Sequence, residues 1–234
     1  MEKLMGMSEV LECTIIKRVN RFVVEIEIDK TVYYAYINNT GRLEELLTRG
    51  RRGFCIRSRA ARKTSHRLFA IKYHELGAIV DTRIQMRCFE KAISIGAIPW
   101  LKGYRILKRN VRLNSSMIDY LLTSKKGEVY LEMKSAVMRK GEYAMYPDCP
   151  SPRGRRHVRD LMKFVSSGGR GIILFVAGIP GVTAFKPNRD ADVQLYSLLR
   201  KAVDVGVCLK AIAIHYDPKT SYVYLYDPDL RVLI

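Results

Sequence analysis

The pattern of hydrophobic residues changes near Gly77, and this change constrains the fold more than any other feature of the chain. Before that point, apolar residues form short runs rich in β-branched and aromatic side chains, which is typical of strands. These runs cover residues 13–19, 22–28, 32–37, 54–59 and 67–73. Beyond it, segments with helical periodicity alternate with apolar runs. We therefore expect two domains, residues 1–78 and residues 79–234, in a chain of mixed α+β class.

The first domain is predicted to be a small β-barrel. Its strands are short, residues 20–21 and 29–30 are candidate two-residue hairpin connections, and only residues 43–47 suggest a helical turn. Closing such a sheet removes its exposed edges, and the oligonucleotide-binding (OB) barrel is a five-stranded fold of this kind. An SH3-like barrel is the alternative.

The second domain is predicted to be α/β with a mixed central sheet. Residues 82–95 carry an apolar stripe at helical spacing, and Asp81 or Thr82 can cap that helix. Ser151 and Pro152 are typical of the start of a second helix, which extends through residue 164. The continuous apolar run at 171–177 indicates a strand buried on both faces. Other strands are expected at 104–109, 116–122, 129–133, 209–215 and 222–226, and a third helix at 192–205.

Two acidic residues stand where the predicted strands place them on one face. Asp119 lies inside an apolar strand, where a carboxylate is costly unless it is paired or bound to metal. Glu132 and Lys134 are two residues apart on the next strand, so their side chains point to the same side. If the strands form a hairpin, both carboxylates and the Met133 carbonyl make an all-oxygen site suited to Mg²⁺ or Mn²⁺. Lys134 could then position a water or stabilise charge on a phosphate.

Glu90, on the preceding predicted helix, is the third candidate acid. We expect it to face Asp119 and Glu132 from that helix. Two simpler interpretations stay open: Glu90 forms a salt bridge with Arg87 one turn away, and Glu132 pairs with Lys134 on a solvated hairpin.

The chain is strongly basic, and its basic residues gather in two clusters. It has 41 Lys and Arg against 23 Asp and Glu, a net charge of +18 and a pI near 9.8, which is typical of polyanion binders. The first cluster suits the basic groove of an OB barrel, and the second stands at a helix start, where cations oppose the helix dipole but a phosphate binds well. Solvated basic surfaces are the alternative. The clusters are Arg49, Arg51, Arg52, Arg57, Arg59, Arg62, Lys63 and Arg67, and then Arg153, Arg155, Arg156 and His157.

Several tracts resemble the sugar fermentation stimulation protein A (SfsA) family, in order along nearly the whole chain. They are Asn38-Asn39-Thr40-Gly41, residues 89–93, 118–122 and 131–135, Tyr146-Pro147-Asp148 and Arg153-Gly154-Arg155-Arg156-His157. The resemblance implies an OB-like first domain and a second domain of the PD-(D/E)XK nuclease fold. It places the nuclease acids at Glu90, Asp119 and Glu132, and the lysine at Lys134. The sequence departs from the family at Asn38, where the family has proline, and at Asp81, where it has asparagine.

The family is described as DNA-binding, with a regulatory role in sugar (maltose) metabolism. We therefore expect a DNA-binding protein without sequence specificity that has a Mg²⁺- or Mn²⁺-dependent phosphodiesterase, or nuclease, site. A regulator that keeps the fold but does not cleave is the alternative. An RNA-binding protein is a third, lesser interpretation, because phosphate charge dominates affinity for both nucleic acids and nothing in the sequence separates them.

Other features narrow the class of protein. Five scattered cysteines without a CxxC pair argue against a cysteine zinc site. The longest apolar stretch, residues 171–182, is shorter than the roughly 18 residues that span a bilayer, and the first residues lack an export signal. We expect a cytoplasmic protein without membrane contact. Glutamine occurs only at positions 85 and 194, which favours a thermophilic source.

Overall fold

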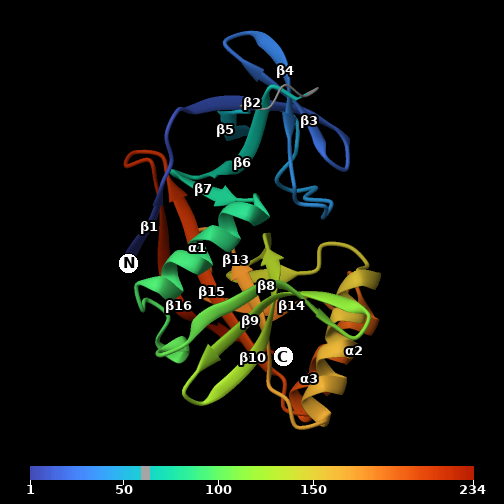
Figure 1. Ribbon diagram of the computed structural model, residues 1–234. Coiled ribbons are helices and arrows are strands. Elements are labelled where there is room, and N and C mark those ends of the chain that lie inside the picture. The colour runs from blue at the N-terminus through green and yellow to red at the C-terminus, as the bar shows by residue number, and fades with distance from the viewer. Residues whose placement is uncertain (59–63) are drawn as a thin grey trace.

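A computed structural model describes residues 1–58 and 64–234, and it shows a β-barrel above an α/β domain (Figure 1). The predicted nucleic-acid contacts Arg59, Arg62 and Lys63 lie outside the described residues. No helix in the described part of the chain is long and apolar enough to cross a membrane.

The barrel is a closed OB fold of five strands. Its strands are β2 (Val10–Asn20), β3 (Val23–Ile28), β4 (Thr31–Tyr36), β5 (Arg52–Arg57) and β6 (His66–Tyr73). They pair in the order β2-β3-β4-β6-β5 and back to β2, and only β4 and β6 run parallel. Closure leaves no open edge. Residues 43–47 form a single turn, with the Leu47 N–H donating to the Leu43 carbonyl at 2.9 Å.

The second domain is built on a mixed sheet. Its strands β8 (Arg105–Leu113), β9 (Ser116–Ser124), β10 (Gly127–Ala136), β13 (Gly171–Ala177), β15 (Cys208–Asp217) and β16 (Tyr222–Val232) lie side by side in this order. The β10–β13 and β13–β15 pairs are parallel and the others antiparallel. Three short strands, β11 (Met138–Lys140), β12 (Tyr143–Tyr146) and β14 (Ala184–Pro187), form a small sheet beside the end of β16.

Helices cover both faces of the central sheet. On one side, α1 (Thr82–Ser94) packs Cys88 and Phe89 against alternate residues of the central strands. On the other side, α2 (Pro152–Ser166) and α3 (Val193–Asp204) pack against the intervening residues. The side chains of Asp81, Ser151 and Asp192 accept backbone N–H groups at the three helix starts, which explains where each helix begins. A 3₁₀ turn, η1 (Pro99–Leu101), follows α1.

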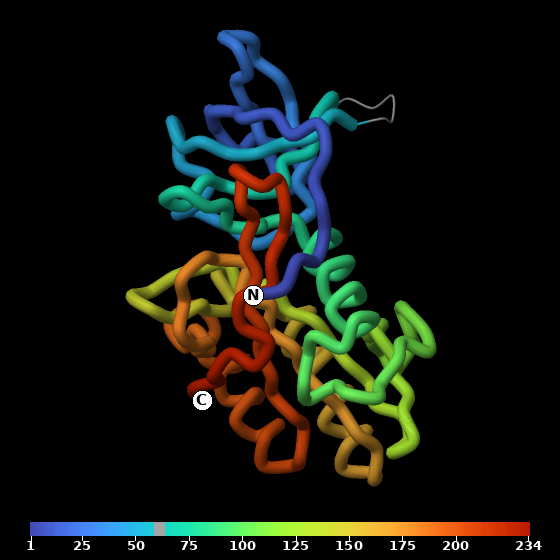
Figure 2. Tube along the Cα trace, turned by 90° about the vertical axis from the view of Figure 1, so that its left-hand side faces the viewer, coloured from blue at the N-terminus to red at the C-terminus, as the bar shows by residue number. Residues whose placement is uncertain are grey.

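The two ends of the predicted first domain take part in the second domain's sheet. Strand β1 (Glu2–Gly6) pairs with β16, and β7 (Leu76–Ile79) pairs with both β6 and β15. Figure 2 shows the β15–β16 hairpin rising to the barrel, where Tyr216 packs edge-on against Phe54 and Phe69 at about 5 Å. These contacts join the barrel firmly to the α/β domain, so the two parts form a fixed junction.

Candidate metal and nucleic-acid site

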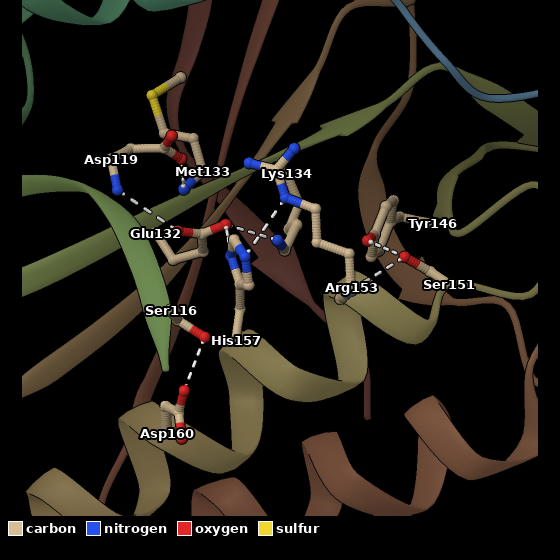
Figure 3. Close-up of polar contacts among 11 residues, drawn as sticks. Ser116, Asp119, Glu132, Met133, Lys134, Tyr146, Ser151, Arg153, His157 and Asp160 are labelled. Carbon is tan, nitrogen blue, oxygen red and sulfur yellow. Dashed lines mark hydrogen bonds and ion pairs between the residues drawn. The ribbon is translucent and has the colours of Figure 1, made fainter. Parts of the chain in front are cut away.

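The structure brings Asp119, Glu132 and Lys134 together on neighbouring strands β9 and β10 (Figure 3). The Asp119 N–H donates to Glu132 Oε2 at 3.3 Å, and the Met133 N–H donates to Asp119 Oδ2 at 2.8 Å. Lys134 Nζ donates to Glu132 Oε1 at 2.6 Å. His157 of α2 holds the same oxygen through Nδ1 at 2.5 Å. Each carboxylate is therefore fixed in position by contacts with its neighbours.

The local course of β9 explains the position of Asp119. Ile118 packs with the core beneath α2 and α3, whereas Tyr120 packs with the core beneath α1. The regular alternation of side chains along β9 is therefore interrupted at Asp119. The β9–β10 pairing ends at Tyr120 and Leu131, so the N–H of Met133 is free to bind the Asp119 carboxylate.

The electrostatics of the pair favour a cation. Burial and the Glu132 charge raise the pKa of Asp119 to about 7, although the Met133 N–H opposes this. Burial also disfavours ionised Glu132, but the Lys134 ammonium and His157 outweigh it, and the pKa of Glu132 is lowered. The pKa of Lys134 is raised, because the Glu132 carboxylate outweighs the effect of burial. The positive charge around the two carboxylates therefore mainly stabilises ionised Glu132, while the negative charge of Asp119 is poorly compensated.

The donor set suits a hard divalent ion. Carboxylate oxygens of Asp119 and Glu132 and a main-chain carbonyl are ligands that Mg²⁺ and Mn²⁺ prefer, and such an ion would relieve the repulsion that raises the pKa of Asp119. The described residues contain no group of three or more His, Cys, Asp or Glu side chains arranged for a metal. A metal here would therefore depend on two carboxylates, with main-chain oxygen, water or phosphate completing its coordination.

Glu90 does not face this pair, which corrects the prediction. It accepts hydrogen bonds from Arg109 at 2.7 and 2.8 Å and from the Tyr120 hydroxyl at 2.9 Å. Tyr120 lies on the α1 side of the sheet, whereas Glu132 contacts His157 on the α2 side. Glu90 therefore lies beside β9, but on the face of the sheet opposite to the one predicted. Its partner is Arg109 on β8 and not Arg87 one turn away, so the simpler interpretation named the wrong arginine.

A cleft of about 570 Å³ opens over Asp119 and Glu132, between the barrel and the α/β domain. Barrel residues line one side, including the β2–β3 turn and residues 38–41, and the other side comes from β10, residues 145–154 and Thr82. Gly41 lies against Asp148 so closely that a Cβ at position 41 would come within 2.5 Å of its carboxylate. The site therefore stands at the junction of the two parts of the protein.

The Asn38–Gly41 tract fixes this junction. Asn38 Nδ2 donates to Asp81 Oδ1 at 2.9 Å, and Asn38 Oδ1 accepts the Thr82 N–H at 2.9 Å. Asn39 Nδ2 contacts the Val80 carbonyl at 3.2 Å and Ser135 Oγ at 3.3 Å. The sequence singled out this tract only through its family resemblance. Its asparagines reach the start of α1 and the strand that carries Glu132.

Three of the side chains predicted to contact nucleic acid instead contact carboxylates of the protein itself. Arg67 is held by the buried cap residue Asp81. Arg155 Nη1 contacts both oxygens of buried Asp192 at 2.9 and 3.0 Å. His157 is buried against Glu132. Clustering by charge did not identify these roles, because each acidic partner is 14 to 37 residues away in the chain.

The other cluster members are more accessible. Arg51 donates to the Glu45 carbonyl at 2.5 Å, and Arg52 lies 3.7 Å from Glu12 at an exposed pair. Arg153 is exposed at the cleft and donates to His157 Nε2 at 3.3 Å. Exposed cations without an ion-pair partner among the described residues include Arg49, Arg57 and Arg156. They also include Arg83, Arg87 and Lys91, which the sequence reasoning missed although they recur every fourth residue along α1.

The fold and the cleft together define a class of protein: a closed OB barrel joined to an α/β domain, with an acidic pair and a lysine at their junction. Two family models match the chain, the SfsA N-terminal OB domain over residues 16–80 and the sugar fermentation stimulation protein RE domain over residues 83–220. The chain belongs to the sugar fermentation stimulation protein (SfsA) family.

Its relatives match over nearly their whole length. Sugar fermentation stimulation protein homologues of Archaeoglobus fulgidus and Pyrococcus furiosus are 44% and 43% identical over 232 and 222 residues, which is 99% and 95% of this chain and 100% and 96% of theirs. A solved structure of Pyrococcus furiosus SfsA in complex with Ca²⁺ is 41% identical and superposes with a TM-score of 0.96 over 100% of both chains.

Proposed function

We propose that this protein binds nucleic acid and hydrolyses its phosphodiester bonds at a divalent-metal site of the PD-(D/E)XK type. The observation that carries the proposal is the convergence of Asp119, Glu132 and Lys134 on adjacent strands beneath one cleft. The Ca²⁺ complex of the Pyrococcus furiosus relative supports a hard-cation site in this fold, because Ca²⁺ and Mg²⁺ both prefer oxygen ligands.

Asp119, Glu132 and the Met133 carbonyl would hold Mg²⁺ or Mn²⁺. Such an ion, when bound, polarises a phosphate oxygen and lowers the pKa of water. His157 and Lys134 fix the orientation of the Glu132 carboxylate. Lys134 also brings a permanent positive charge to the cleft, where it stabilises negative charge that develops on phosphorus oxygens.

The partner we propose is DNA, bound mainly through its phosphates. The net charge of +18 and the exposed Arg153 and Arg156 near the site supply attraction that does not depend on base sequence. RNA carries the same phosphate charge, so the experiment includes it.

Incubation of labelled single-stranded DNA, double-stranded DNA and RNA with Mg²⁺, Mn²⁺ or EDTA tests the proposal. We expect metal-dependent cleavage by the wild type, and a loss of at least about 100-fold for Asp119→Ala and Lys134→Met, the size typical of removing one electrostatic contributor. The matched control is Asp160→Asn, because Asp160 is a buried acid on α2 that binds Ser115 and Ser116 outside the cleft. Binding without cleavage under all metal conditions would refute the hydrolytic part and favour the non-cleaving regulator.

A further inference from the structure

Phe22 is an exposed aromatic residue in the same cleft as the acidic pair. It sits in the turn between β2 and β3, and 45% of its surface is exposed. Tight turns favour glycine, asparagine and aspartate for conformational reasons, so turn formation does not explain a phenylalanine there. Core packing does not explain it either, since nearly half of the residue's surface faces solvent.

The backbone of the turn that carries Phe22 is anchored by hydrogen bonds. The Phe22 N–H donates to Asn20 Oδ1 at 2.9 Å, and the Phe22 carbonyl accepts the Ile37 N–H at 2.9 Å. Arg18 donates to the carbonyls of Arg21 at 2.9 Å and Asn39 at 3.0 Å, which ties the turn to residues 38–42. The backbone that carries the ring is therefore held in place before any ligand arrives.

The same contacts connect the turn that carries Phe22 to the strand that carries Glu132. Asn39 reaches Ser135 Oγ, and Ser135 lies on β10 next to Lys134 and three residues from Glu132. The β2–β3 turn, residues 38–41 and β10 thus form one hydrogen-bonded frame around the cleft. The Arg21 guanidinium lies 5.9 Å from the centre of the Phe22 ring and brings a positive charge to the cleft lining.

We propose that Phe22, with Arg21, is a stacking platform for an unpaired base, so that the cleft takes single-stranded nucleic acid or a frayed end. A base in a duplex has both faces covered by its neighbours, so it stacks on Phe22 only after leaving the duplex. Arg21 then contacts a phosphate of the same strand. This inference rests on the proposed function, because it assumes that the strand enters the cleft over Asp119 and Glu132.

Binding in EDTA tests the platform separately from cleavage. The probes are a single-stranded oligonucleotide with one 2-aminopurine base and a matched duplex. We expect Phe22→Ala to weaken single-strand binding about 5- to 150-fold, the range given by loss of one stacked base, and to remove the quenching of 2-aminopurine. Duplex binding should change less than about 2-fold, since phosphate contacts dominate it.

The matched control is Tyr34→Ala. Tyr34 is 47% exposed on β4 of the same barrel but lies outside the residues that line the cleft. Phe22→Trp should retain binding and quenching, and Phe22→Leu should lose quenching while keeping an apolar side chain in the turn. Equal effects of Phe22→Ala and Tyr34→Ala, or equal loss for both probes, would overturn the inference. Failure of the wild type to bind either probe would instead refute the nucleic-acid part of the proposed function.

Discussion

Replacing Asp119 by asparagine should stabilise the metal-free protein, in a way that depends on pH. In the folded protein the pKa of Asp119 is raised to about 7 from an ordinary value of 3.8. Ionising Asp119 is therefore less favourable in the folded protein than in the unfolded chain. Each tenfold change in proton affinity is worth about 1.4 kcal/mol, which sets an upper limit of about 4 kcal/mol. Because the side chain keeps some solvent contact, we expect about 2 to 4 kcal/mol at pH 8.

The sign follows from which state holds the proton. Between about pH 4 and pH 7 the folded protein keeps a proton on Asp119 that the unfolded chain has lost, so this residue makes the unfolding free energy fall as pH rises. Asp119→Asn removes that dependence, and its advantage should shrink to about 1 kcal/mol near pH 4.5. The asparagine oxygen can still accept the Met133 N–H.

Urea denaturation in EDTA at several pH values measures the difference in unfolding free energy between the wild type and Asp119→Asn. Asp190→Asn is the control, because Asp190 is exposed and lies outside the residues that line the cleft. At pH 8, saturating Mg²⁺ should recover part of the stability that the wild type loses between about pH 4 and pH 7, since the ion binds the ionised form. Parallel pH curves for the wild type and Asp119→Asn would refute the raised pKa of Asp119.

Three further predictions concern the basic and acidic residues around the site. Arg155→Ala should lower the unfolding free energy by about 1.5 to 3 kcal/mol, because it leaves buried Asp192 without its ion partner. Arg156→Ala should weaken DNA binding and leave the melting temperature unchanged. The opposite pattern would make Arg155 the DNA contact and Arg156 the structural residue. Glu90→Gln should lower the melting temperature by breaking its ion pair with Arg109 but leave cleavage per folded molecule unchanged, and lost cleavage at normal stability would return Glu90 to the site. If binding neutralises about five phosphates, log K against log salt should fall with a slope near −4 to −5, and a flat dependence would contradict phosphate-dominated binding.

The helices and strands with strong periodicity could be predicted from the sequence. The short strands that pair with distant parts of the chain could not. The predicted strand at 171–177 and the start of α2 at Pro152 agree with the structure, because a continuous apolar run and an N-cap followed by proline are local signals. Strands β1, β7, β11, β12 and β14 were not predicted. They have three to five residues each, and their pairing with distant strands leaves little pattern in so short a stretch.

The candidate site was also only partly predictable from the sequence. Alternation on adjacent strands was enough to bring Glu132 and Lys134 to one face beside Asp119. It failed for Glu90, because a helix stripe does not show which face of the sheet the helix will cover. Charge clustering also failed for Arg155, whose acidic partner Asp192 is distant in sequence and close only in the fold.

If Asp119 and Glu132 form the metal centre, the protein should bind Mn²⁺ through these two carboxylates. Electron paramagnetic resonance titration counts free and bound Mn²⁺ without requiring turnover. We expect a Mn²⁺ site in the wild type and in Asp160→Asn that is lost in Asp119→Asn and Glu132→Gln, with all four proteins shown to be folded by circular dichroism. Mn²⁺ binding that survives both cleft substitutions, or that is absent from the wild type, would contradict it.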